Sequence, residues 1–331
     1  MPATIRDIRR MTGLSLATIS KYLNGGNVLP ENRIRIEKAI DELGYEVNEI
    51  ARWLATKKTR TIGVIVYDIQ SLFNSTLLSY ISESLRAAGY GLLICDSADN
   101  AEQEGKNIRF LLSKKVDGIL LIPVNGDEHD LALATEAGVP VVLLDRPVRG
   151  RTCVKIDNPA AAASVVELLS ENGHRDIALI GSEGEYTGRK RCEGFASAMK
   201  ERGYLLKDCF IKNGTASIQF GYESMKQLLA IDKKPTAVFM TNYEITLGGV
   251  MAVNESSVRC PEDISLVGFD NLILSQIVKP KMTMVVQPMR AMGEKAVEVL
   301  MKSMDHKEGY FCPDEINLPT TIDLGNSIRK L

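Results

Sequence analysis

Apolar residues recur at helical spacing in the N-terminal part of the chain. Three short amphipathic helices are predicted there, over about residues 5–11, 16–23 and 31–43. Thr4 and Ser15 stand directly before the first two helices, where short hydroxyl side chains cap free backbone N–H groups. A short capped helix after a tight glycine turn is the helix-turn-helix pattern of DNA-binding proteins, although other three-helix bundles share it.

After a short helical stretch at residues 48–55 and a basic linker at 57–60, apolar runs of strand length alternate with amphipathic helices. Strands are predicted over residues 62–66, 91–95, 118–122, 141–144, 177–180, 237–240 and 266–268. Helices are predicted over residues 76–88, 102–113, 127–137, 160–172, 188–202, 219–229 and 245–254. Continuous apolar strands separated by helices predict parallel sheets covered on both faces. The alternation runs twice, so we expect two doubly wound subdomains with a ligand cleft between them, at the carboxyl ends of the strands.

Charge is distributed unevenly along the 331 residues, although the net charge is only −2. Residues 1–60 contain 11 basic and 7 acidic side chains, whereas the remainder contains 29 basic and 35 acidic ones. A basic end on an acidic body suggests that one end of the molecule meets phosphate.

The composition gives no support for a metalloprotein, a disulfide-bonded protein or a membrane protein. The six cysteines form no CxxC pair, and the three histidines are far apart, so we expect free thiols, no metal and no cofactor. A signal peptide and a long apolar run are both lacking, so a cytoplasmic protein without membrane contact is expected. Gly181-Ser182-Glu183-Gly184 lacks the third glycine of a dinucleotide loop, and no nucleophile triad can be assembled, so an enzyme is not expected.

The second helix carries the candidate DNA-reading residues. Leu16 and Ala17 lie at its start and Lys21 one turn later, where side chains reach base edges in the major groove. The short polar residues suited to phosphate oxygens are Ser15, Thr18, Ser20 and Asn24. The alternative is that Leu16 is a core residue of a small bundle.

Long stretches of the sequence resemble the lac repressor family of bacterial regulators. They include TIRDIRRMTGLSLATISKYLNGG, LGYEVNEIARWLATKKTRTIGVIV, KKVDGILLIP, GVPVVLLDRP and CPEDISLVGFDN, in family order over nearly the whole chain. The resemblance implies an N-terminal all-α helix-turn-helix domain and an α/β sensor of two doubly wound parallel-sheet subdomains, like periplasmic binding proteins.

The resemblance also implies a hinge helix that folds on DNA. Leu54 matches the leucine that wedges between the central base pairs, and Ala51 faces the minor-groove floor. An isolated eight-residue helix is marginal in water, which is consistent with ordering by DNA. Thr4, Tyr45 and Asn48 complete the DNA-contacting set. The alternative is that Leu54 packs on the sensor.

For the sensor, the resemblance implies an effector site whose side chains bind ligand hydroxyls, as suits sugars and their phosphates. Arg191 and Asp270, expected on loops after separate strands, are the main candidates. Further candidates are Asp145, Asn242, Thr187 and Phe73. The alternatives are an interdomain salt bridge for Arg191 and Asp270, and helix capping for Asn242 and Asp145. Ala216 stands where the family usually has an aromatic residue, which indicates a remodelled pocket.

The expected organisation follows the family. Residues 1–46 form the DNA-binding domain, 47–60 the hinge, and 61–331 the sensor. The first sensor subdomain comprises 61–158 with 287–317, and the second comprises 159–284 with 318–331. We expect a homodimer, because no heptad tail follows the sensor. We also expect the dimer to bind a near-palindromic operator, with a sugar-like effector controlling whether the operator is bound or released. The alternatives are a solute-binding receptor module and a corepressor-dependent regulator controlled by a protein partner.

Overall fold

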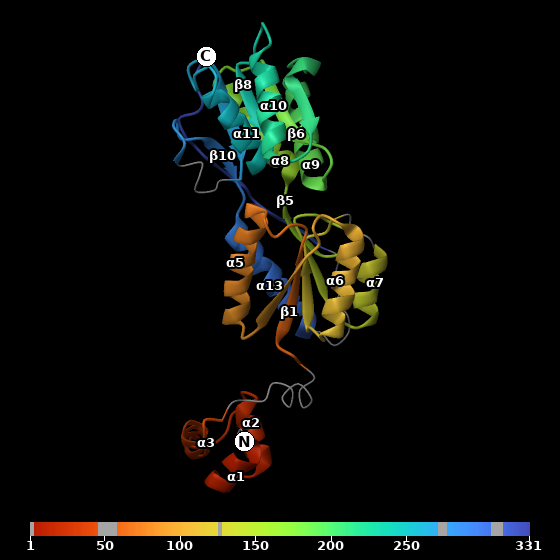
Figure 1. Ribbon diagram of the computed structural model, residues 1–331, viewed down its shortest axis with the longest axis vertical. Coiled ribbons are helices and arrows are strands. Elements are labelled where there is room, and N and C mark those ends of the chain that lie inside the picture. The colour runs from red at the N-terminus through yellow and green to blue at the C-terminus, as the bar shows by residue number, and fades with distance from the viewer. Residues whose placement is uncertain (1–2, 46–57, 125–127, 271–276, 306–313) are drawn as a thin grey trace.

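The computed structural model describes residues 3–45, 58–124, 128–270, 277–305 and 314–331. A helical N-terminal unit lies at one end, followed by two α/β bodies, each built around its own sheet (Figure 1). The fold class expected from the sequence is thereby confirmed. None of the helices in these ranges has the length and apolar character needed to cross a membrane.

The N-terminal unit contains α1 (Ile5–Thr12), α2 (Leu16–Leu23) and α3 (Pro30–Leu43). The predicted caps are present. Thr4 donates to the Asp7 carboxylate from both its backbone N–H (3.0 Å) and its hydroxyl (2.7 Å), and Ser15 Oγ accepts from the Thr18 N–H (3.1 Å). The buried core of the unit is small and consists of Ile8, Ile19, Ile36 and Ala39.

The first sheet has the strand order β11-β5-β4-β3-β1-β2, with every paired neighbour parallel. Its strands are β1 (Thr61–Val66), β2 (Gly91–Asp96), β3 (Gly118–Leu121), β4 (Val141–Leu144), β5 (Cys153–Ile156) and β11 (Glu315–Leu318). Its helices are α5 (Leu72–Ala87), α6 (Ala101–Ser113), α7 (Glu128–Glu136) and α13 (Met289–Asp305). Helices α5 and α13 pack together on one face, and α6 and α7 cover the other (Figure 1).

The second sheet has the order β12-β10-β9-β8-β6-β7, in which only the β10–β12 pair among the described strands is antiparallel. Its strands are β6 (Ile177–Ser182), β7 (Ile211–Gly214), β8 (Ala237–Met240), β9 (Ser265–Phe269), β10 (Thr283–Val286) and β12 (Thr321–Asp323). The helices are α8 (Asn158–Glu171), α9 (Tyr186–Glu201), α10 (Ile218–Leu229) and α11 (Tyr243–Asn254), with a 3-10 turn, η1 (Asp208–Phe210). Alternate residues of each central strand face the α8–α9 pair and the α10–α11 pair, so both faces are covered.

Among the described elements the chain passes three times between the sheets, after β5, after β10 and after β11. These crossings connect the two bodies, which lie one above the other with the carboxyl ends of the main strands toward each other (Figure 1). The loops that follow those strands therefore meet in the space between the bodies, which is where parallel α/β sheets bind ligands.

Candidate DNA-reading helix and effector cleft

Helix α2 buries one face and exposes another. Ile19 is fully buried against α1 and α3, whereas Leu16, Ala17 and Lys21 are exposed. The side chain of Leu16 is 37% exposed, so the interpretation of Leu16 as a core residue is wrong. An apolar residue exposed at the start of a capped helix is available to touch thymine methyl groups.

The short polar residues of α2 are partly engaged within the helix. Ser15 Oγ lies 2.9 Å from Thr18 Oγ1, and the Asn24 amide donates to the Ser20 carbonyl (2.9 Å). These hydroxyl groups retain free lone pairs or rotatable hydrogens for a phosphate oxygen. Thr4 is exposed at the start of α1, and Tyr45 packs half-buried against the small core. Asn48, Ala51 and Leu54 lie outside the described residues.

A cavity of about 490 Å³ lies between the two sheets, and we call it the cleft. All six sequence-predicted effector residues line it: Phe73, Asp145, Thr187, Arg191, Asn242 and Asp270. They come from α5, from the ends of β4, β8 and β9, and from α9. The six residues that the resemblance implied lie up to about 200 positions apart in the sequence, and the fold brings them to one cavity.

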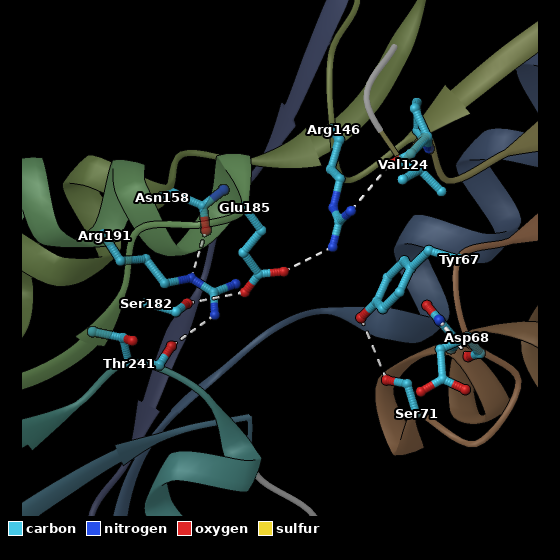
Figure 2. Close-up of polar contacts among 12 residues, drawn as sticks. Tyr67, Asp68, Ser71, Val124, Arg146, Asn158, Ser182, Glu185, Arg191 and Thr241 are labelled. Atoms are coloured by element: carbon cyan, nitrogen blue, oxygen red, sulfur yellow. Dashed lines mark hydrogen bonds and ion pairs between the residues drawn. The ribbon is translucent and has the colours of Figure 1, made fainter. Parts of the chain in front are cut away.

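Arg191 lies within helix α9, so its expected position on a loop is wrong. Its side chain extends from the second turn of the helix back toward the strand ends. Nε donates to Asn158 Oδ1 (2.7 Å) and Nη1 to the Thr241 carbonyl (2.8 Å) (Figure 2). The guanidinium also stacks 3.7 Å from the Phe269 ring centre. These contacts hold a buried cation in one orientation at the wall of the cleft.

Asp270 follows β9 directly and is held in the left-handed backbone region at φ 67°. Its Oδ1 accepts from Gln287 Nε2 at 2.5 Å. Burial raises the pKa of its carboxyl, and Arg191 partly opposes that shift. No ion pair joins Arg191 to Asp270 within the described residues, so the salt-bridge alternative lacks support.

Asp145 follows β4 in the same left-handed backbone conformation, at φ 64°. Its side chain is 4% exposed, and Oδ1 has no hydrogen-bond partner in the described part of the chain. Burial raises its pKa to about 6, against the opposing effect of Arg146 and Arg191. Asp145 is the N-cap residue of none of the helices in the described part of the chain. Asn242 does cap a helix, because its Oδ1 accepts from the Ile245 N–H at the start of α11 (2.9 Å).

Sequence reasoning missed an ion pair that crosses the cleft. Arg146 Nη2 lies 2.7 Å from Glu185 Oε2, and its Nη1 donates to the Pro123 carbonyl (3.1 Å). The same guanidinium lies 4.1 Å from the ring centre of Tyr67, whose pKa is raised by burial (Figure 2). Tyr67 and Arg146 come shortly after β1 and β4, and Glu185 shortly after β6, so the strand-end rule could have found them.

Comparisons with known proteins assign both parts of the chain. Residues 4–48 match the family model "Bacterial regulatory proteins, lacI family", and residues 166–328 match "Periplasmic binding protein-like domain". Catabolite control protein A of Priestia megaterium is 34% identical over 310 residues, covering 92% of this chain and 93% of the relative. This chain belongs to the lacI family. It is therefore a regulatory protein with a DNA-binding unit and a periplasmic-binding-protein-like sensor.

Other relatives agree with that assignment. The HTH-type transcriptional repressor PurR of Pasteurella multocida is 32% identical, with 92% of this chain and 93% of the relative covered. The fold matches a lac repressor dimer solved with operator and anti-inducer, with a TM-score of 0.85, 24% identity, and coverage of 99% of this chain and 100% of that one. The interpretation as a solute-binding module without a regulatory role is not favoured.

This lacI-family regulator departs from the pattern that the resemblance implied in the wall of its cleft. Ala216 lines the cavity at the position where the resemblance implied an aromatic side chain, and Tyr243 lines it as well. The Tyr243 hydroxyl is buried without a hydrogen-bond partner among the described residues. This wall therefore combines a small side chain at Ala216 with a buried, unpartnered hydroxyl at Tyr243 among the described residues.

Proposed function

We propose that this lacI-family regulator is a repressor that binds a near-palindromic operator as a homodimer. The observation that carries the proposal is the exposure of Leu16, Ala17 and Lys21 on a helix whose opposite face is buried at Ile19. An exposed face at the start of the second helix suits entry into the major groove. The two-fold symmetry of a dimer matches two half-sites.

Lys21 is proposed to donate to guanine, with Leu16 and Ala17 against thymine methyl groups. The proposed backbone contacts are Thr4, Ser15, Thr18, Ser20, Asn24, Tyr45 and Asn48. Ala51 and Leu54 are proposed to enter the minor groove, where an apolar wedge unstacks a base step in return for a bent duplex with more contacts.

The proposed division is a DNA-binding domain at residues 1–46, a hinge at 47–60 and a sensor at 61–331. Within the sensor, residues 61–158 with 287–317 and residues 159–284 with 318–331 form the two subdomains. The two separate sheets, with β11 in the first and β12 in the second, support this division.

The proposed effector is a small sugar-like molecule held in the cleft by Asp145, Arg191 and Asp270, with Phe73, Thr187 and Asn242 around them. Because the cleft lies between the subdomains, a ligand that bridges them favours one angle between the bodies over another. That angle sets the separation of the two hinges in the dimer, so effector affinity and operator affinity are coupled reciprocally.

The protein is further proposed to act in the cytoplasm, where its operator lies, without catalysing a reaction and without a cofactor. Membership in a family of DNA-binding regulators supports this assignment.

The test is a fluorescence titration of a palindromic duplex selected from a random library, against a scrambled duplex of equal length, at several salt concentrations. We expect the selected duplex to bind roughly 1,000-fold more tightly, with a dimer on each duplex. Equal affinities with the same steep salt dependence would contradict sequence-specific binding, because phosphate contacts alone produce that result.

A further inference from the structure

The lining of the cleft is strongly weighted toward negative charge. Two guanidinium groups, those of Arg146 and Arg191, face it. Six carboxylates also line it: Asp68, Asp99, Asp145, Glu185, Glu244 and Asp270. The field inside a concave site with low-dielectric walls is set by such an imbalance, so the cleft repels anions.

Both cations are already engaged by protein groups. Arg146 is paired with Glu185 and bonded to the Pro123 carbonyl, and its guanidinium is stacked on Tyr67. Arg191 donates to Asn158 and to the Thr241 carbonyl. A phosphate group that takes bidentate hydrogen bonds from Arg146 would compete with Glu185 and the Pro123 carbonyl. Arg191 offers a phosphate only the guanidinium hydrogens that lie outside its bonds to Asn158 and Thr241.

Helix N-termini offer the other usual means of binding an anion, and here they carry carboxylates. Helices α9 and α11 both begin at the cleft. Glu185 is the N-cap residue of α9, and Glu244 lies in the first turn of α11. Because each of these helix ends carries a glutamate of the protein, neither end favours a ligand phosphate.

Most of the buried polar atoms that line the cleft without a partner among the described residues are hydrogen-bond acceptors, so a ligand would have to supply donors. Asp145 Oδ1 and Gln287 Oε1 are acceptors only, both residues are 4% exposed, and neither atom has a partner in the described part of the chain. The Tyr243 hydroxyl, on a residue 7% exposed, can act either way. Among the buried lining atoms that lack a partner in the described residues, Arg146 Nε is the only one that can act solely as a donor. Buried acceptors without partners are costly, so a ligand that supplies hydroxyl or amino hydrogens binds with a large gain.

We propose that the effector is a donor-rich small molecule without an anionic group, an unphosphorylated polyol or its amino derivative, and that phosphorylated sugars are excluded. This inference rests on the proposed function, because it concerns the same cleft. Hydroxyl and ammonium groups share the required chemistry, since both donate hydrogen bonds to carboxylates. A phosphate adds close to two negative charges near neutral pH and offers almost only acceptors.

The test compares matched ligands by calorimetry and thermal unfolding of the full-length protein. The neutral probes are glucose, galactose and ribose, the amino probes are glucosamine and galactosamine, and the anionic probes are glucose 6-phosphate, galactose 6-phosphate and ribose 5-phosphate. We expect at least one neutral or amino probe to bind, and its phosphate ester to bind at least about tenfold more weakly. The neutral and amino arms identify which donor the cleft prefers.

Two outcomes overturn the proposal. One is a phosphate ester that binds as tightly as its parent sugar or more tightly. The other is the absence of binding by every neutral and amino probe in the millimolar range.

Glu244→Gln sharpens the result, with Glu171→Gln, at an exposed carboxylate at the end of α8, as its matched control. Removing the cleft carboxylate is expected to reduce the discrimination against the phosphate ester by roughly threefold to tenfold, and the control to leave it unchanged. Equal discrimination in both variants and the wild type contradicts the role of the carboxylates, provided that thermal unfolding shows both variants folded.

Operator binding with the same probes separates this proposal from the proposed function. A sugar that binds the cleft without changing operator affinity contradicts the allosteric function and leaves the ligand class standing. A phosphate ester that weakens or strengthens operator binding supports the allosteric function and contradicts the proposed ligand class.

Discussion

Helix α2 and the cleft hold their proposed functional side chains in different environments. Leu16 is 37% exposed on α2, with Ala17 and Lys21 also at the surface, whereas Arg191 and Asp145 are 3% and 4% exposed in the cleft. The α2 side chains project toward solvent, but Arg191 is fixed by two hydrogen bonds and an aromatic ring.

Function and folding stability are therefore related differently in the two regions. Exposed reading residues contribute little to folding, so the helical unit depends on its few buried apolar side chains. Cleft residues are buried charges whose desolvation costs free energy before any ligand arrives, in return for a preorganised site. Substitutions on α2 should therefore separate binding from stability, and substitutions in the cleft should couple them.

The largest expected effect is on the folding of the helical unit. Ile19→Ala removes a fully buried side chain from a four-residue core and is expected to destabilise the unit by about 3 kcal/mol. Hydrogen exchange of the α1–α3 amides measures this loss, and the sensor amides should be unaffected. Leu16→Ala on the same helix is the matched control, expected to change stability by less than about 0.5 kcal/mol. Equal losses in the two variants would remove the distinction between the faces of α2.

In the cleft, Asp145→Asn is expected to change folding stability in the opposite direction, toward a more stable protein. The folded-state pKa of Asp145, about 6, lies above its ordinary value, so folding favours the protonated carboxyl. The charged form therefore destabilises the folded state above pH 6, and this cost disappears as the pH falls below about 4. Asp145→Asn should stabilise the unliganded protein by about 2 kcal/mol at pH 8, with no gain at pH 4, and should weaken effector binding.

Urea unfolding at both pH values tests this, with Asp232→Asn at an exposed loop position as the control. A variant less stable than the wild type at pH 8 would show that the carboxylate is compensated in the free protein.

A smaller effect is expected at the ion pair across the cleft. Glu185→Gln leaves the buried Arg146 without its carboxylate and should destabilise the sensor by about 1 kcal/mol, with a more open average angle in small-angle scattering. Glu298→Gln, which removes an exposed carboxylate paired with Lys295 and Lys302 on α13, should change neither quantity. A sensor with unchanged stability and scattering would show that the pair does not join the subdomains energetically.

Strands such as β4 and β8 could be predicted from the sequence because they are continuous apolar runs buried on both faces. The inner strands β5 and β10 are also largely buried, but they were not predicted. Strand β7 was missed because it is an edge strand in which Lys212 and Asn213 interrupt the apolar pattern. Strands β11 and β12 are only partly buried, so they also gave no clear signal.

The cleft was partly predictable for a similar reason. Strand ends locate Asp145 and Asp270 without tertiary information, because both follow buried strands directly. The ion pair between Arg146 and Glu185 could not be predicted from the sequence, because it forms only where the two bodies meet. The direction of the Arg191 side chain, from a helix toward Thr241, likewise depends on packing rather than on local pattern.

The affinity ratio between specific and scrambled DNA in Leu16→Ala tests the central claim most directly. Both duplexes are titrated at one salt concentration with wild type and variant. If the exposed face of α2 reads sequence, the ratio falls about tenfold while the scrambled duplex binds as before and thermal unfolding is unchanged. An unchanged ratio, or equal losses on both duplexes, would contradict the assignment of α2 as the reading helix.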